Sequence, residues 1–195
     1  MSVVACKNGA FFTSFTPDCA MKHSVLLMEK IDEALEKLQM RASDCDFFAC
    51  VVGAGSFTGI RIGISAIKGL CLATGKPSIA VTSFDTMAYN AIDGVQTGKV
   101  LCLVDALHGW YYACGYENGK VVFEPAYISQ EQVLELQASG FTLLSAENLS
   151  LQTTIVNPTE GLKNATLALE KQGQFGELNA LYIRKSSAEL NAKRG

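Results

Sequence analysis

The residues of this chain best placed to do chemistry lie in one glycine-rich run, GAGSFTGIR, from Gly53 to Arg61. An apolar stretch over 47–52 precedes the run, and a segment rich in Ile, Ala and Gly follows it. This order predicts a strand, a glycine turn and a helix, a unit whose free backbone N–H groups often bind phosphate. The glycine spacing is G-x-G-x-x-x-G, whereas dinucleotide sites use G-x-G-x-x-G and P-loops end in G-K-[ST]. Both common nucleotide-binding interpretations therefore fail on spacing.

Ser56 and Thr58 are the candidate nucleophiles of this run. No histidine lies within the run to activate them, and the G-x-S-x-G order of hydrolase nucleophiles is absent from it. Serine and threonine also cap helices by accepting backbone N–H bonds, and this is the role that we expect for both. Arg61, at the start of the following helix, is suited either to an anion or to a carboxylate on an exposed face.

No metal or other cofactor is expected. His23 precedes a predicted helix, but position 27, one turn later, is leucine instead of a second ligand. His108 falls in a predicted hairpin loop. Asp105 follows a predicted strand and is a candidate acid, base or metal ligand, although the chain has no paired carboxylates at catalytic spacing.

Composition indicates a folded protein of the reducing cytoplasm. Hydrophobic residues make up 49% and charged residues 18% of the chain, which excludes disorder. The net charge of −3 gives no global attraction to nucleic acid. The seven cysteines include no C-x-x-C pair, so we expect small core residues. No membrane span or signal peptide is expected, since no apolar run approaches the necessary length.

The hydrophobic pattern predicts an α/β protein with two similar halves, 1–96 and 97–195, joined at the glycine-containing segment 93–98. Asn8-Gly9 and Asn118-Gly119 predict hairpin turns. The predicted strands are 2–6, 11–15, 47–52, 79–82, 99–105, 110–116, 121–123 and 141–144. The predicted helices are 24–38, 59–73, 83–94, one that a capping box opens at Ser129 and that stops before Gly140, and 159–171.

The run from Gly53 to Gly63 resembles the hallmark of the TsaB (YeaZ) family, which usually has proline where this chain has Ala54. Further matches follow the family's order along nearly the whole chain. They are His23-Ser24 with Leu26-Leu27, Ala66 with Lys68-Gly69-Leu70, Asp105-Ala106, and Leu181-Tyr182-Ile183-Arg184 with Ala188-Glu189.

This resemblance implies an actin-like (ASKHA) duplicated fold of two small mixed-sheet subdomains. It also implies a non-catalytic scaffold subunit, which binds and activates TsaD in the threonylcarbamoylation of tRNA adenosine 37. TsaE and tRNA would then act through the complex. The alternative is an enzyme with the actin-like fold, either an ATP-dependent kinase or a glycoprotease-like hydrolase. A lone His23 and the lack of a phosphate loop disfavour that alternative.

Three glycines in one predicted helix, Gly59, Gly63 and Gly69, suggest that another backbone approaches closely, because each costs up to about 1 kcal/mol in a helix. The preceding helix and a partner protein explain this equally well. The resemblance implies that both helices form the TsaD face, with Gly63 exposed on it; alone, the chain would pair as a two-fold dimer. The predicted partner interface is Leu27, Ile31, Gly59, Ile60, Gly63, Ile64 and Ile67.

The resemblance also bears on the start of the chain. The family begins with a strand that ends in an Asp-Thr or Asp-Gly phosphate loop, and nothing of this kind precedes Ser2. We therefore expect a fold that lacks the first strand and leaves two unpaired strand edges. We also expect an in-frame coding stretch before Met1 for roughly ten further residues.

Overall fold

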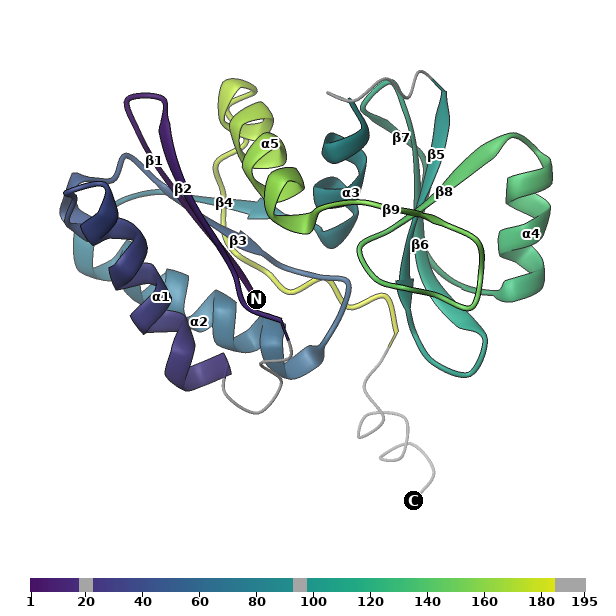
Figure 1. The fold of residues 1–195 in the computed structure, drawn as a ribbon, viewed down its shortest axis with the longest axis horizontal. Helices are drawn as coiled ribbons and strands as arrows, with labels where there is room; N and C mark the ends of the chain where they lie inside the picture. Colours follow the sequence, from purple (N-terminus) through teal and green to yellow (C-terminus); the bar gives the residue numbers. More distant parts are fainter. Residues whose placement is uncertain (18–22, 93–97, 185–195) are drawn as a thin grey trace.

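A computed structural model describes residues 1–17, 23–92 and 98–184, which form two α/β lobes side by side (Figure 1). The first lobe begins with β1 (Ser2–Lys7), β2 (Ala10–Phe15), α1 (His23–Lys37), the 3-10 helix η1 (Ala42–Asp44) and β3 (Phe48–Val51). It continues with α2 (Phe57–Thr74), β4 (Ser78–Val81) and α3 (Ser83–Ile92). The second lobe has β5 (Lys99–Asp105), β6 (Trp110–Glu117), β7 (Lys120–Ser129), α4 (Gln130–Ala138), β8 (Phe141–Ser145) and β9 (Thr154–Ile155). After β9, α5 (Pro158–Lys171) lies against the first lobe.

The strands of the first lobe form two separate pairs. β1 and β2 make an antiparallel hairpin, whose turn residues Asn8 and Gly9 both have positive φ, as the Asn-Gly pair predicted. β3 and β4 lie parallel, and α2 connects them in the chain. α1 and α2 cover one side of these strands and α5 covers the other (Figure 1).

The second lobe is built on one five-stranded mixed sheet, in the order β7-β6-β5-β8-β9. The central strand, β5, pairs antiparallel with β6 and parallel with β8. One face of the sheet packs Val100, Cys102 and Leu144 against α3, and the other packs Leu101 and Leu103 near α4. A strand buried on both faces needs a nearly continuous apolar run, and β5 has one.

The end of the described chain returns to the first lobe. α5 packs against β1, β4 and α3, and a Cβ at Gly161 would overlap the backbone carbonyl of Thr86. Beyond α5, Gly176 donates its N–H to the carbonyl of Ser78 at 2.9 Å, and Leu178 is buried in the core beneath α2. The predicted segment 97–195 therefore contributes its last helix to the core of the first lobe.

The predicted helices and most of the predicted strands are confirmed within one to two residues, but η1 and β9 were not predicted. β7 is longer than predicted, extending to Ser129, which opens α4 with the expected capping box.

The expectation that no segment reaches the length of a membrane span needs correction. The 18-residue helix α2 is long and apolar enough by length and composition alone, a test that helices of soluble cores also pass.

Candidate functional site

The loop from Gly53 to Ser56 is held in place by its backbone. Gly53 and Gly55 have φ values of 126° and 148°, which side chains rarely allow. Ser83, at the start of α3, donates its N–H to the carbonyl of Gly53 at 2.5 Å and its hydroxyl to that of Ala54 at 2.6 Å. A Cβ at Gly53 would lie 2.8 Å from the carbonyl oxygen of Leu181. The loop is thus packed between α3 and the terminal segment of the chain.

Ser56 is the N-cap of α2, and its hydroxyl accepts the N–H of Gly59 at 3.3 Å. The predicted capping role of Ser56 is confirmed. Thr58 lies exposed in the first turn of the helix instead of at its cap.

Arg61 interacts with aromatic rings, and no carboxylate among the described residues forms an ion pair with it. Its guanidinium lies 3.8 Å from the ring centroid of Phe57, and its Nε donates to the hydroxyl of Tyr182 at 3.0 Å. Phe57 and Tyr182 stack with their centroids 5.0 Å apart. Two segments distant in sequence, the glycine-rich run and Leu181–Arg184, therefore meet at this point.

The predicted partner residues mostly face inward. Ile64 lies in the core with Cys50 and Val52, so it is not available to a partner. A Cβ at Gly63 would lie 3.3 Å from the sulfur of Cys50, so Gly63 faces β3, which corrects the expected exposed position. Six of the seven line one cavity of about 780 Å³: Leu27, Ile31, Gly59, Ile60, Gly63 and Ile67.

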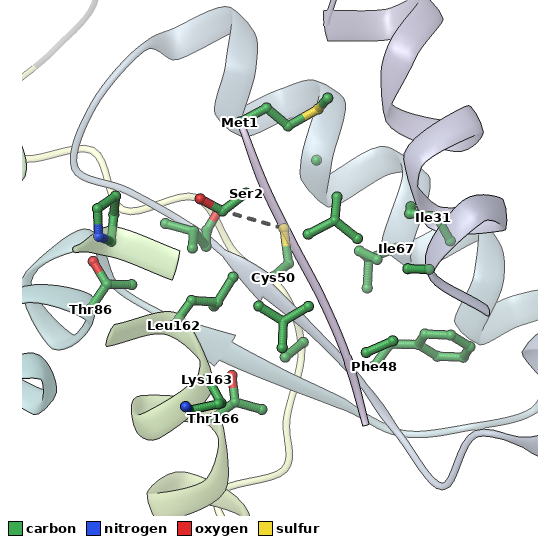
Figure 2. Close-up of a pocket in the computed structure, with 18 of the residues that line it drawn as sticks. Met1, Ser2, Ile31, Phe48, Cys50, Ile67, Thr86, Leu162, Lys163 and Thr166 are labelled. Atoms are coloured by element: carbon green, nitrogen blue, oxygen red, sulfur yellow. Dashed lines mark hydrogen bonds between the residues drawn. The ribbon is translucent and has the colours of Figure 1, made fainter. Parts of the chain in front are cut away.

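This cavity separates β1 from β3 (Figure 2). Ile31 and Ile67 approach it from one side, and Leu162 and Thr166 of α5 approach it from the other. Burial raises the pKa of the Cys50 thiol on β3 to about 11, so this thiol is neutral at physiological pH. The cavity walls are mainly apolar, and the charged residues Asp46, Glu147, Lys163 and Glu170 also line the cavity.

A polar network that sequence reasoning missed joins the two lobes. Asp85 accepts the N–H and the hydroxyl of Thr82 at 2.8 and 2.7 Å, which caps α3. Its other oxygen accepts the hydroxyl of Tyr116, on β6, at 2.9 Å. Burial raises the pKa of Tyr116 far above its usual value, so the tyrosine stays protonated and donates. The Thr-x-x-Asp spacing at 82–85 was the available signal for the cap.

Of the remaining candidate residues, Asp105 and His108 belong to the turn between β5 and β6. The carboxylate of Asp105 accepts the N–H of Leu107 at 2.8 Å and so shapes the turn into β6. His108 lies in that turn, between the antiparallel strands β5 and β6, so the predicted hairpin loop is confirmed. The side chain of His23 lies outside the described residues. Within the described part of the chain, no three His, Cys, Asp or Glu side chains gather as metal ligands.

Comparison with known proteins places these features in a family. The family model described as TsaD, tRNA N6-adenosine threonylcarbamoyltransferase, matches residues 14–176. The chain belongs to this family. Its fold is that of YeaZ from Pseudomonas aeruginosa, to which it is similar with a TM-score of 0.76 and 21% identity over 93% of both chains. The expected α/β fold of the TsaB (YeaZ) family is confirmed.

Curated relatives of this family carry the TsaB name that the resemblance suggested. The tRNA threonylcarbamoyladenosine biosynthesis protein TsaB of Escherichia coli K12 is 34% identical over 104 residues, which are 52% of this chain and 45% of the relative. TsaB of Bacillus subtilis 168 is 30% identical over 57% of this chain and 48% of the relative. The chain thus spans about half the length of the curated relatives that it matches.

Proposed function

We propose that this chain is a non-catalytic accessory subunit, which binds and activates TsaD in threonylcarbamoylation of tRNA adenosine 37. The observation that carries the proposal is how the glycine-rich loop uses its polar groups. The Ser56 hydroxyl caps α2, Arg61 lies against Phe57 and Tyr182, and two loop carbonyls accept bonds from Ser83. These polar groups thus stabilise the fold of the chain itself. A second argument comes from the relatives, since the TsaB proteins are named for a biosynthetic pathway instead of a reaction.

The proposed division of labour leaves the chemistry to TsaD. This chain would hold TsaD in its active form in the cytoplasm, with TsaE and tRNA acting through the complex. In the absence of TsaD, a face that can bind another helical protein also supports a two-fold dimer of this chain.

The proposed TsaD face is the outer surface of α1 and α2. The interface residues that we predicted from the sequence lie mainly on the inner surface of these helices. They would therefore pack beneath the proposed face instead of contacting TsaD. Exposed apolar side chains remain on the outside: Val25 on α1 is 72% exposed and Leu72 on α2 is 88% exposed. Space is also open beside Gly69, where another backbone can approach. Exposed apolar side chains of this size are available to a protein partner.

The experiment is a binding titration of TsaD from the same organism with purified protein and charged variants. Leu72→Lys and Val25→Lys, on the outer face, should each weaken TsaD binding by about tenfold or more, since a desolvated charge at an interface costs more than about 1.4 kcal/mol. The matched control is Val122→Lys, a 48%-exposed position on β7, which should bind normally. Wild-type affinity of both outer-face variants, with normal thermal melts, would contradict this choice of face.

A further inference from the structure

The second lobe carries two stacked aromatic rings and one arginine at its surface. The ring centroids of Trp110, on β6, and Tyr127, on β7, are 4.6 Å apart, and the ring planes differ by 6°. The guanidinium carbon of Arg184 lies 5.1 Å from the centroid of Tyr127, and its Nη1 donates to the tyrosine hydroxyl at 3.2 Å. Trp110 is 38% exposed, so part of this stack is open to a ligand.

The terminal segment connects this stack to the contact at Arg61 in the first lobe. Tyr182, two residues before Arg184, stacks on Phe57 and is itself 46% exposed. The intervening Ile183 packs against the core, so outward and inward side chains alternate. Figure 1 shows the end of the described chain running from the first lobe toward the second. We call this surface the aromatic row: Phe57, Arg61, Tyr182, Arg184, Tyr127 and Trp110.

The two arginines of the aromatic row keep their positive charge uncompensated. Among the described residues, both ion pairs lie elsewhere, within α1 and within α5, so neither includes Arg61 or Arg184. Each guanidinium lies against an aromatic ring instead. The row therefore offers a local positive charge at each lobe, although the whole chain has a net charge of −3. A local group of cations is what an acidic chain needs to contact a nucleic acid.

We propose that the aromatic row binds unpaired nucleotides of tRNA, with bases stacked on Trp110 and Tyr182 and phosphates next to Arg61 and Arg184. Proteins that bind single-stranded RNA combine these two features, rings on which bases stack and cations that follow the backbone. Rings and arginines also suit a protein partner. The choice of RNA rests on the proposed function, since the family model is that of an enzyme that acts on tRNA adenosine.

The row would add to the RNA contacts of TsaD and not replace them. Two open rings and two cations give few contacts, so this chain alone should bind RNA weakly and in a salt-dependent way. Within the complex, TsaD and this chain would hold one tRNA together, and a weak contact then contributes because both proteins are linked. This agrees with tRNA acting through the complex.

The test follows the fluorescence of Trp110, the one tryptophan of the chain, as RNA is added. The probe is an anticodon stem-loop that contains adenosine 37, and a fully paired RNA duplex of equal length is the control. The stem-loop should quench Trp110 saturably, because a base stacks on its ring, and the duplex should quench it much less. Raising NaCl from about 50 to about 200 mM should weaken binding about sevenfold, as expected for two phosphate contacts in a single strand.

Two arginine variants test the charge of the row. Arg184→Gln should lower the salt effect to about threefold, since one phosphate contact remains. The matched control is Arg41→Gln, at an exposed arginine outside the row, which should keep the wild-type salt effect. The same salt effect in both variants would overturn the proposal, as would quenching by the duplex that equals quenching by the stem-loop.

A ring variant separates RNA binding from the proposed function. Trp110→Leu should weaken binding of a labelled stem-loop about tenfold, measured by fluorescence anisotropy, and should still elute with TsaD. Loss of TsaD binding by this variant, with unchanged affinity for the stem-loop, would mean that a protein covers the row, and would overturn the proposal. Wild-type protein that binds the stem-loop but does not raise the rate of TsaD-dependent modification would support RNA binding by the row and contradict the accessory function.

Discussion

Arg61 donates from its Nε to the hydroxyl of Tyr182 at 3.0 Å, although the two residues are 121 positions apart. Next to this bond, Leu181 donates its N–H to the carbonyl of Val52 at 2.8 Å. The start of α2 and the terminal segment are therefore one structural unit. The two separate stretches of sequence that resemble the same family are therefore in direct contact.

The first prediction concerns this contact. Arg61→Ala removes the cation from the ring of Phe57 and the bond to Tyr182, and should lower the free energy of unfolding by about 1 kcal/mol. Limited proteolysis should show faster cleavage within 176–184. Tyr182→Phe keeps the stacked ring and should lose roughly half as much. If Arg61→Ala is as resistant to protease as the wild type, the contact does not hold the segment.

The second prediction compares how substitutions at two glycines of α2, Gly69 and Gly63, change the stability of the protein. Gly69 has open space beside it, so Gly69→Ala should raise the free energy of unfolding by up to about 1 kcal/mol through helix propensity. Gly63 faces Cys50 instead, so Gly63→Glu should lower it by about 2 kcal/mol, because the carboxylate meets the strand and the apolar cavity. Urea denaturation of both variants, with Gly69→Glu as the matched charge control, checks this. A Gly63→Glu protein as stable as Gly69→Glu would place Gly63 on an exposed surface after all.

The third prediction tests the packing of α5 on α3. A methyl group at Gly161 would overlap the carbonyl of Thr86, so Gly161→Ala should destabilise the protein by roughly 3 kcal/mol or force α5 away. Gly176, which has no neighbour within 4 Å of its would-be Cβ, provides the control, and Gly176→Ala should be nearly neutral. Thermal melts decide the matter: equal midpoints for the two variants would contradict the close approach of the helices.

The fourth prediction concerns alkaline pH. Burial raises the pKa of the Cys114 thiol to about 12, above its ordinary value of 9.0. The folded protein then keeps a proton that the unfolded chain releases, so stability is full below pH 9 and falls as pH rises toward 12. Denaturation midpoints of Cys114→Ala should fall less steeply between pH 9 and 11 than those of the wild type. Cys6→Ala, at an exposed site, should follow the wild-type slope; identical slopes for all three would contradict the shift.

Local features of the fold could be predicted from the sequence because their signals are local. The Asn-Gly turns, the cap at Ser56 and the capping box at Ser129 each depend on a few neighbouring residues, and all three formed as expected. The apolar run over 99–105 likewise predicted a strand, and the structure has β5 at these residues.

Long-range relations could not be predicted in the same way. An apolar strip on a helix marks a covered face but not what covers it, so Ile60 and Ile67 suggested a partner where the structure has a cavity and a core. Nothing in the run around Arg61 indicates that Tyr182 would lie beside it. The two-residue strand β9 is too short to give a period.

The most direct test of the central claim is a reconstitution of tRNA adenosine 37 modification with TsaD, TsaE and threonylcarbamoyl-adenylate. We predict that this chain alone forms no product, that it elutes with TsaD as a stoichiometric complex, and that its addition raises the rate of TsaD-dependent modification. Modification at the same rate with and without this chain, together with separate elution of TsaD, would contradict the proposed accessory function.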